Sequence, residues 1–396
     1  MDQALPAKAL LAAPRDPAPV AAQTMVEVAK QHGVSPFRQM REMWTLKRGA
    51  GKLDSHEYHA TGVFDPAMPM DEKKTYVGRI GSFEINQRLS PPKLTETRAF
   101  LRDKVMYTAL LQQLGLPTTQ TQAVVHRTRH FGSLRTLRGA AAVENFLKSD
   151  AAYPLFVKPC EGAASVGSAL ITGRDGETLT LGNGRSVDLN GFAAEVVEDY
   201  PEGFILQSAV AQHPALTAVT GPAVGTMRVV TIRDANGARP LYTVWKVPSP
   251  SAMSDNFWQA GSMVAEVQDG SVIRCKKGTG LAAEWLDAHP VSNIPFAGLE
   301  VPHWDAIQKV ATEGHMLFPE FGIVGWDIAV GADGPVIIEC NDNPFHALYQ
   351  LATGRGILNG DLAPQLDAAA AQSRAILDGK VATFKARERA KGRKVR

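Results

Sequence analysis

The chain has 396 residues, which is long enough for two or three domains with separate cores. Hydrophobic residues make up 44% and charged residues 21%, as in ordinary soluble globular proteins. The net charge is +2 and basic residues cluster only at the C-terminus, so we expect no nucleic-acid partner. No uncharged apolar run approaches the ~18 residues of a membrane-spanning helix, so we expect no membrane span.

The cysteine pattern favours a reducing compartment. Cys160, Cys275 and Cys340 are far apart, odd in number and without CxxC spacing, so they form neither a disulfide framework nor a typical thiolate metal site. The first twenty residues carry an acid at position 2 and several prolines, unlike a secretory signal. We therefore predict a cytoplasmic protein.

The first quarter of the chain is predicted to be mainly helical. Residues 1–24 are rich in Ala and Pro and are predicted to be disordered. Residues 25–94 read as a helical lead-in, interrupted near Gly33. Ser35 is a suitable N-cap for the helix that follows, and Pro36 fits the first helical turn.

Beyond residue 94, helical and strand patterns alternate. Helices are predicted over 95–114, 139–148, 192–198, 304–318 and 363–377. Strands are predicted over 118–125, 153–157, 168–171, 204–210, 227–232, 240–247, 263–267, 325–330 and 336–339. The last two strands are joined by Gly-Ala-Asp-Gly, a composition typical of a hairpin turn.

The segment FVKPCEGAASVGS, residues 156–168, has the composition of a phosphate site. Lys158 ends an apolar strand, so its ammonium is offered from a rigid support. The glycines and serines that follow let backbone N–H groups approach phosphates. Separately, a strand-end lysine is usually solvated and a glycine loop is usually a turn. Their combination favours phosphate binding.

The segment VGWDIAVGADGPVIIECNDN, residues 324–343, has the composition of a magnesium site. Glu339 and Asn341 are two positions apart on a strand and therefore share a face. Asp327 lies on the neighbouring strand of the hairpin and can point the same way. Apolar neighbours indicate that these strands are buried, where an unpaired acid is costly. A bound Mg²⁺ therefore explains the three oxygen donors better than a solvated polar stripe does.

The order of these motifs, with Lys104 before them and a β-rich segment between them, resembles the ATP-grasp superfamily. The chain looks most like the branch named sugar-transfer-associated ATP-grasp, over roughly residues 95–360. The resemblance implies an α+β fold, the ATP-grasp fold, with two α+β lobes holding ATP between them. It divides the chain, after the lead-in, into these parts: a region before the ATP-grasp lobes (95–150), a small lobe (151–210), a large lobe (211–360), and a C-terminal helix with a basic tail (361–396).

The resemblance also implies roles for individual residues. Arg228 and Lys158 would be catalytic, with Arg228 over the γ-phosphate. The nucleotide would be bound by Lys104, Lys158, Glu161, Ser165, Val166, Gly167, Gln207, Ser208 and Val210. Magnesium would be bound by Asp327, Glu339 and Asn341. The acceptor substrate would meet Asn256 and Ser262, from a loop over 245–262, together with His346 and Arg355.

The function implied is an ATP- and Mg²⁺-dependent ligase. It would activate a carboxylate as an acyl phosphate and join it to an amine, so its partners are a small-molecule carboxylate and a small-molecule amine. A phosphotransferase acting on a sugar or polyol hydroxyl is the alternative, because the ATP site would be identical. A nucleotide-binding module without turnover is a third reading. The identity of both substrates stays open, as does the oligomeric state, for which a homodimer is one option.

Overall fold

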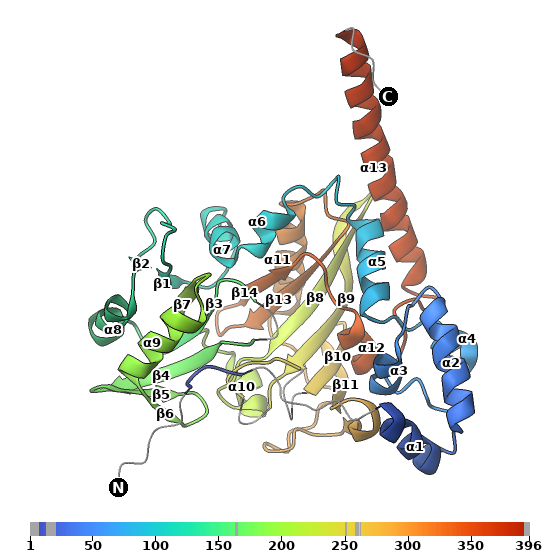
Figure 1. Ribbon diagram of the computed structural model, residues 1–396, viewed down its shortest axis with the longest axis horizontal. Helices are drawn as coiled ribbons and strands as arrows, with labels where there is room; N and C mark the ends of the chain where they lie inside the picture. The colour runs from blue at the N-terminus through green and yellow to red at the C-terminus, as the bar shows by residue number, and fades with distance from the viewer. Residues whose placement is uncertain are drawn as a thin grey trace.

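Two β-sheets organise the chain, and each has its own hydrophobic core (Figure 1). The computed structural model describes residues 8–12, 21–162, 165–249, 252–257, 261 and 263–391. Within these residues the fold consists of a small lobe, a large lobe and a helical lead-in that packs against the large lobe.

The small lobe is built on a sheet with the strand order β2-β1-β7-β3-β4-β5-β6. Its strands are β1 (Thr121–Val125), β2 (Thr136–Leu137), β3 (Leu155–Pro159), β4 (Ala169–Asp175), β5 (Thr178–Leu181), β6 (Ser186–Asp188) and β7 (Phe204–Ser208). Helices α8 (Ala140–Ser149) and α9 (Leu189–Asp199) pack against each other and share the lobe's core (Figure 1). Because β1 pairs antiparallel with β7, the small sheet includes strands from the segment that sequence analysis set apart as 95–150.

The large lobe is built on a second sheet, in the order β12-β11-β10-β9-β8-β13-β14. Its strands are β8 (Thr226–Asp234), β9 (Gly237–Val247), β10 (Met263–Gln268), β11 (Ser271–Lys277), β12 (Glu284–Leu286), β13 (Ile323–Val330) and β14 (Pro335–Asn341). Its helices are α10 (Pro214–Thr220), the 3₁₀ turn η1 (Gly280–Ala282), α11 (Trp304–Met316), α12 (Ala347–Thr353) and α13 (Ala363–Ala390).

Both faces of the large sheet are covered, which explains its nearly continuous apolar strands. On β8, Val229 belongs to the core cluster that contains residues of α11, whereas Val230 and Ile232 belong to the cluster that contains residues of α12 and α13. Every residue of β13 is buried. A charged side chain on these strands must therefore contact an oppositely charged partner or face a cavity.

Seven helices precede β1 within the described residues, five in the lead-in and two in the segment after residue 94. They are α1 (Ala21–His32), α2 (Pro36–Arg48), α3 (Ser55–Ala60), α4 (Met70–Lys73), α5 (Arg79–Leu89), α6 (Arg98–Arg102) and α7 (Lys104–Gln113). The structure confirms Ser35 as the N-cap of α2, because its hydroxyl accepts the N–H of Arg38. The single helix predicted over 95–114 is wrong, since Asp103 ends α6 and caps α7 by accepting the N–H groups of Val105 and Met106.

The N-terminal segment differs from the disorder predicted for residues 1–24. Residues 8–12 lie along the small lobe, where Ala9 and Leu10 are buried in its core. Helix α1 begins at Ala21, and residues 1–7 and 13–20 lie outside the described residues. Burial of two apolar side chains favours this docked conformation.

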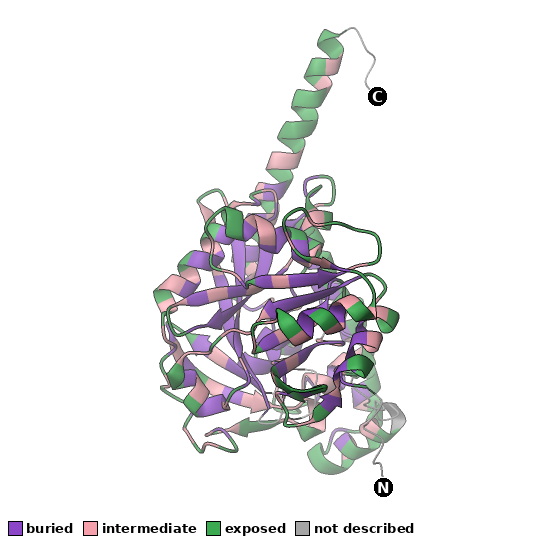
Figure 2. Ribbon diagram, turned by 90° about the vertical axis from the view of Figure 1, so that its left-hand side faces the viewer, coloured by how far each residue is buried: buried purple, intermediate pink, exposed green. Residues whose placement is uncertain are grey.

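The C-terminal helix α13 is longer than the prediction of 363–377. Its first half packs against α5 and β8, and its second half extends beyond the body of the protein and is mostly exposed (Figure 2). No helix in the described part of the chain combines the length and apolarity needed to cross a membrane.

Gly322 provides a steric test of the junction between the lead-in and the large lobe. A Cβ at this position would lie 2.1 Å from the carbonyl oxygen of Leu89, at the end of α5. We expect Gly322→Ala to lower the free energy of unfolding by about 1–3 kcal/mol through overpacking, measured by urea denaturation. In the matched variant Gly379→Ala, the new methyl group meets nothing within 4 Å on exposed α13, so stability should stay equal or rise. Equal losses in both variants would contradict the packing described.

Candidate active site

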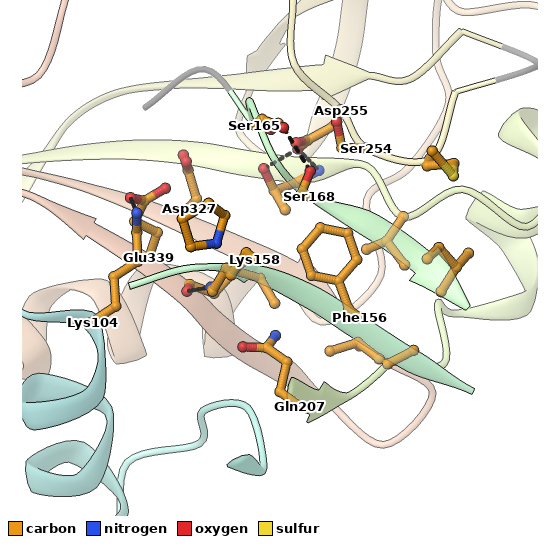
Figure 3. A pocket seen from close by; sticks show the side chains of 18 of the residues that line it. Lys104, Phe156, Lys158, Ser165, Ser168, Gln207, Ser254, Asp255, Asp327 and Glu339 are labelled. Carbon is orange, nitrogen blue, oxygen red and sulfur yellow. Dashed lines mark hydrogen bonds and ion pairs between the residues drawn. The ribbon is translucent and has the colours of Figure 1, made fainter. Parts of the chain in front are cut away.

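A cavity of about 270 Å³ lies between the two sheets, and its two ends differ in chemistry (Figure 3). One end is mainly apolar and is lined by Pro154, Phe156, Leu170, Val210, Pro222, Val224 and Met253. The other end is charged and is lined by Lys104, Lys158, Lys246, Asp255, Asp327 and Glu339. An elongated ligand with an aromatic part and an anionic part fits this division.

Strand β3 supplies side chains to both ends of the cavity. Phe156 and Lys158 are two positions apart, so they share the strand face that borders the cavity (Figure 3). The ammonium of Lys158 lies 3.4 Å from the carbonyl oxygen of Ile338 on β14 and thus links the two lobes. Burial lowers the pKa of Lys158 to about 8, although Glu339 counteracts part of this effect.

Lys104 enters the cavity from the first position of α7. The Asp103 cap fixes this helix start, and a salt bridge from Arg129 at 2.7 Å holds the Asp103 carboxylate. The ammonium of Lys104 donates to the carbonyl oxygen of Gly162 at 3.0 Å and lies 3.6 Å from Glu339. It therefore contacts both the glycine loop and β14, the strand that carries the predicted metal ligand Glu339.

The glycine loop contributes Glu161, Ser165 and Val166 to the cavity lining, as expected for a nucleotide site. Ser165 has φ +55°, an uncommon conformation for a residue with a Cβ, and its carbonyl accepts the Ser168 hydroxyl at 2.7 Å. Backbone strain of this kind clusters at ligand-binding loops.

Gly167, predicted to bind the nucleotide, has a different role in the structure. Its N–H donates to the carbonyl oxygen of Leu11 at 2.8 Å, and it is not among the described residues that line the cavity. A Cβ there would lie 2.4 Å from the Tyr200 hydroxyl oxygen, and φ is +78°. Gly167 thus anchors the loop to residues 8–12, because the space and the conformation both require glycine.

The end of β7 and the residues after it meet the expectations only in part. Gln207 and Val210 line the cavity, and the Gln207 side-chain oxygen accepts from Thr119 at 3.4 Å. Ser208, also predicted to contact the base, uses its N–H to donate to Gln120 at 2.9 Å, and it does not line the cavity of the described residues. Because the N–H of Ser208 already donates to a backbone carbonyl, it is not available to a ligand.

Asp327 lies at the centre of a buried charge cluster. Arg228 donates through two nitrogens to both Asp327 oxygens, and its Nη2 lies 2.9 Å from Oδ2. Lys246 Nζ lies 3.1 Å from the same oxygen and 3.3 Å from Asp255, which also accepts from Thr226. Burial by itself would raise the pKa of Asp327, but Arg228 and Lys246 hold it well below its usual range.

This cluster changes the role assigned to Arg228. The prediction placed its guanidinium over the γ-phosphate, yet the structure engages it with Asp327 and does not place it among the described cavity-lining residues. Bidentate pairing on adjacent strands, with Arg228 directly opposite Asp327, is the physical reason. The cation that borders the cavity beside Asp327 is instead Lys246.

The predicted metal ligands fit Mg²⁺ unequally. Glu339 sits directly opposite Asp327 on the hairpin and lines the cavity, with its side chain 33% exposed. The Nδ2 atom of Asn341 is buried without a hydrogen-bond partner in the described structure. The amide oxygen of Asn341 is the atom that could bind a metal ion. Asp327 already accepts from two cations, although a carboxylate keeps further lone pairs.

The described side chains do not by themselves supply a complete set of metal ligands. Among the described residues, no group of three or more His, Cys, Asp or Glu side chains could hold a metal ion. Mg²⁺ commonly completes its coordination with phosphate oxygens and water, so Glu339 with Asn341 fits such a shared site.

The predicted acceptor-binding residues that the structure describes do not line this cavity. His346 is buried between Tyr242 and Asn86, at 3.0 Å and 3.1 Å, and burial lowers its pKa to about 4. Its Nε2–H donates to the Asn86 side-chain oxygen, which can only accept, so Nδ1 accepts from the Tyr242 hydroxyl. His346 is therefore a neutral structural residue that joins the large lobe to α5.

Two further acceptor candidates, Arg355 and Asn256, also lie apart from the described cavity lining. Arg355 is half exposed and pairs with Asp361 at 2.5 Å, away from the described lining residues. Asn256 is buried next to Asp255 and is not itself part of the described lining. Ser262 lies outside the described residues.

Lys246 and Asp255 lie in the loop over 245–262 that was predicted to lie near the acceptor substrate, but neither was predicted as a site residue. Both line the cavity. Lys246 contacts Asp327 directly, and Asp255 contacts Lys246. A lysine in the apolar strand LYTVWKV was a usable signal, by the reasoning applied to Arg228, because a buried cation requires a partner. Asp255 carries no comparable signal, since it lies in an irregular loop.

Comparisons with known proteins address the family. The family model described as sugar-transfer associated ATP-grasp matches residues 86–363. No curated protein matches the chain.

Solved structures are similar at low identity. D-Ala-D-Ala ligase from Coxiella burnetii shares 11% identity over 74% of this chain and 62% of its own, with TM-score 0.42. L-amino acid ligase from Bacillus licheniformis shares 14% identity over 70% of this chain and 49% of its own, with TM-score 0.38. The biotin carboxylase domain of the Hydrogenobacter thermophilus 2-oxoglutarate carboxylase shares 11% over 69% and 46%, with TM-score 0.39. The chain thus spans about half to two thirds of the length of these proteins.

The Asp327 cluster predicts a large stability effect. Asp327→Ala leaves Arg228 and Lys246 as buried cations without their shared counter-ion, which typically costs about 3–5 kcal/mol. Urea unfolding measures this loss. As a matched control, Asp361→Ala removes the partner of half-exposed Arg355 and should cost less than about 1 kcal/mol. Similar losses for both variants would contradict the central position of Asp327.

The lowered pKa of Lys158 predicts a pH dependence of ATP binding. The ammonium form attracts phosphate, and it is lost as the pH rises through about 8. The ATP affinity should therefore be high below this pH and fall above it, measured by titration calorimetry. Lys158→Arg keeps its charge over the whole range and should remove the decline. A wild-type affinity that stays flat across this pKa would contradict the assignment.

Proposed function

The chain belongs to the sugar-transfer-associated ATP-grasp family, and we propose that it is an ATP- and Mg²⁺-dependent ligase that joins a carboxylate to an amine. The observation that carries the proposal is the two-ended cavity between the lobes, apolar at Phe156 and cationic at Lys104, Lys158 and Lys246. The three buried, unpaired cysteines support a cytoplasmic location as part of the same proposal.

The chemistry of the cavity supports ATP as its occupant. The adenine would lie against Phe156 and Leu170, with Gln207 and Val210 at its edge. The triphosphate would then extend towards Lys158, on the strand that leads into the glycine loop, and Lys104, which contacts that loop at Gly162. Mg²⁺ bound to Glu339, Asn341 and phosphate oxygens would neutralise charge that develops during phosphoryl transfer.

The state of the acidic residues favours a carboxylate acceptor over a hydroxyl acceptor. A sugar hydroxyl needs a general base to take its proton, whereas a carboxylate is already an anionic nucleophile. Of the acids that line the cavity, Asp255 and Asp327 are held by Lys246 and Glu339 faces Lys104, so these three have a cation beside them. No histidine lines the cavity in the described part of the chain. The phosphotransferase alternative would therefore have to use Glu161, the exposed acid of the glycine loop, as its base.

The proposed reaction has two steps. A carboxylate oxygen attacks the γ-phosphorus, the bond to the β–γ bridging oxygen breaks, and ADP leaves. An amine nitrogen then attacks the acyl carbon of the acyl phosphate, the carbon–oxygen bond breaks, and inorganic phosphate leaves as the nitrogen loses its proton. Lys104 and Lys158 hold the phosphates, Lys246 offers positive charge beside Asp327, and the glycine loop excludes water from the acyl phosphate.

Measurement of both products distinguishes the candidate functions. The protein is incubated with ATP, Mg²⁺ and pooled carboxylates and amines, and ADP and inorganic phosphate are quantified together. Equal amounts of both, dependent on both pools, are expected of a ligase. ADP without free phosphate would contradict the ligase and indicate phosphoryl transfer to an acceptor. ATP binding without turnover in any pool would indicate a binding module.

Glu339 provides the test of the metal assignment. Glu339→Ala removes a carboxylate from the charged end of the cavity, so turnover should fall by a factor of about 10² to 10³. The matched control is Glu284→Ala, a half-exposed carboxylate that also pairs with a lysine, at 2.9 Å, and whose loss should leave turnover unchanged. Wild-type turnover in Glu339→Ala at ordinary Mg²⁺ concentrations would show that the metal ligands lie elsewhere.

A further inference from the structure

Helix α2 of the lead-in carries an apolar stripe that faces solvent. The stripe consists of Phe37, Met40 and Trp44, whose exposed fractions are 74%, 50% and 60%. Spacings of three and four residues place the three side chains on one face of the helix. The opposite face is buried and contains Gln39, Glu42 and Leu46. Isolated exposed apolar residues are common, but an ordered stripe of two aromatic rings and a methionine marks an interaction surface.

Basic residues flank this stripe on both sides. With 3.6 residues per turn, Arg41 and Arg48 fall on one flank and Lys47 falls on the other, and all three are exposed. The Arg48 guanidinium lies 3.9 Å from the centre of the Trp44 ring, yet most of the ring remains in solvent.

The outward face of α2 carries no exposed acid. The acidic residue of the helix, Glu42, is buried and engaged by Lys73 at 2.7 Å and by Arg38 at 2.9 Å. This face therefore combines apolar side chains with positive charge only.

We infer that the outward face of α2 binds the surface of a lipid bilayer that contains anionic headgroups. Phe37, Met40 and Trp44 insert at the boundary between headgroups and acyl chains, where aromatic rings are favoured. Arg41, Lys47 and Arg48 extend from the edges of the stripe to the headgroup phosphates, because long basic side chains reach out of apolar surroundings.

The position of α2 allows this contact while the cavity stays open to substrates. Figure 1 shows α2 at the right-hand edge of the molecule, among the lead-in helices and far from the small lobe. It also precedes the residues that match the family model, which begin at 86. Membrane binding is therefore a separate property of the lead-in, independent of the ligase reaction.

The charge pattern favours lipid over a second copy of the chain. Packing two α2 faces together would bring Arg41, Lys47 and Arg48 of both copies into proximity, and like charges in contact destabilise an interface. An anionic bilayer instead attracts each basic residue, with an affinity gain of roughly fivefold per charge near the surface.

Vesicle flotation with the full-length protein tests the inference. Vesicles of phosphatidylcholine alone are compared with vesicles that also contain phosphatidylserine. The wild-type protein should float with the anionic vesicles and not with the neutral ones. Phe37→Ala/Trp44→Ala should reduce binding by about tenfold or more, because it removes the inserted rings. The control Ile273→Ala/Val291→Ala removes exposed apolar side chains outside the lead-in and should bind as the wild type does.

A second pair of variants tests the charges. Arg41→Glu/Lys47→Glu should weaken binding to anionic vesicles, whereas Lys309→Glu/Arg374→Glu makes the same charge change on other helices and should not. All four variants should keep wild-type ADP production and thermal unfolding, since the altered residues are exposed. Equal binding of the α2 variants and the wild type would overturn the inference. So would equal binding to neutral vesicles, or no binding to either kind, which would leave an acidic protein partner as the occupant of α2.

Discussion

The buried pairing of Asp327 with Arg228 and Lys246 is the interaction on which the cleft depends. The three residues come from β13, β8 and β9. Their contact therefore fixes the register of these three strands beside the charged end of the cavity. A carboxylate between two cations needs no proton and stays ionised at any physiological pH. Glu339 lies directly opposite Asp327 and 3.6 Å from Lys104, and it is the acid that we propose shares a metal ion with phosphate oxygens.

The second constraint is that the N-terminal segment, residues 8–12, holds the glycine loop through backbone hydrogen bonds. Leu11 accepts the N–H of Gly167, and the N–H of Leu11 donates to Ser168 at 3.1 Å, so the N-terminal segment pairs with the loop through backbone groups. Glu195 on α9 holds the same segment by accepting the N–H of Ala9 at 2.7 Å. The loop is therefore fixed on its outer side while Ser165 and Val166 remain towards the cavity. Such support lets the loop approach phosphates without ordering itself at each turnover.

Sequence reasoning found the features that are encoded locally. The Ser35 cap, the hairpin of β13 and β14, and the position of Lys158 on β3 before its loop each depend on a few adjacent residues. It missed the features set by long-range register. The partners of Asp327 lie 99 and 81 residues away, and Leu11 lies far from Gly167 in sequence, so no local pattern shows that these groups are engaged. The burial of His346 was missed for the same reason, because its partners Asn86 and Tyr242 come from α5 and β9.

Titration calorimetry with a non-hydrolysable ATP analogue, with and without Mg²⁺, tests the central claim that this cleft is a magnesium–nucleotide site. The account predicts binding that strengthens with Mg²⁺ in the wild type. It predicts that Glu339→Ala loses this strengthening but retains metal-free binding, while Phe156→Ala weakens binding in both conditions. Binding of the analogue that is indifferent to Mg²⁺, or unchanged by either substitution, would contradict the account.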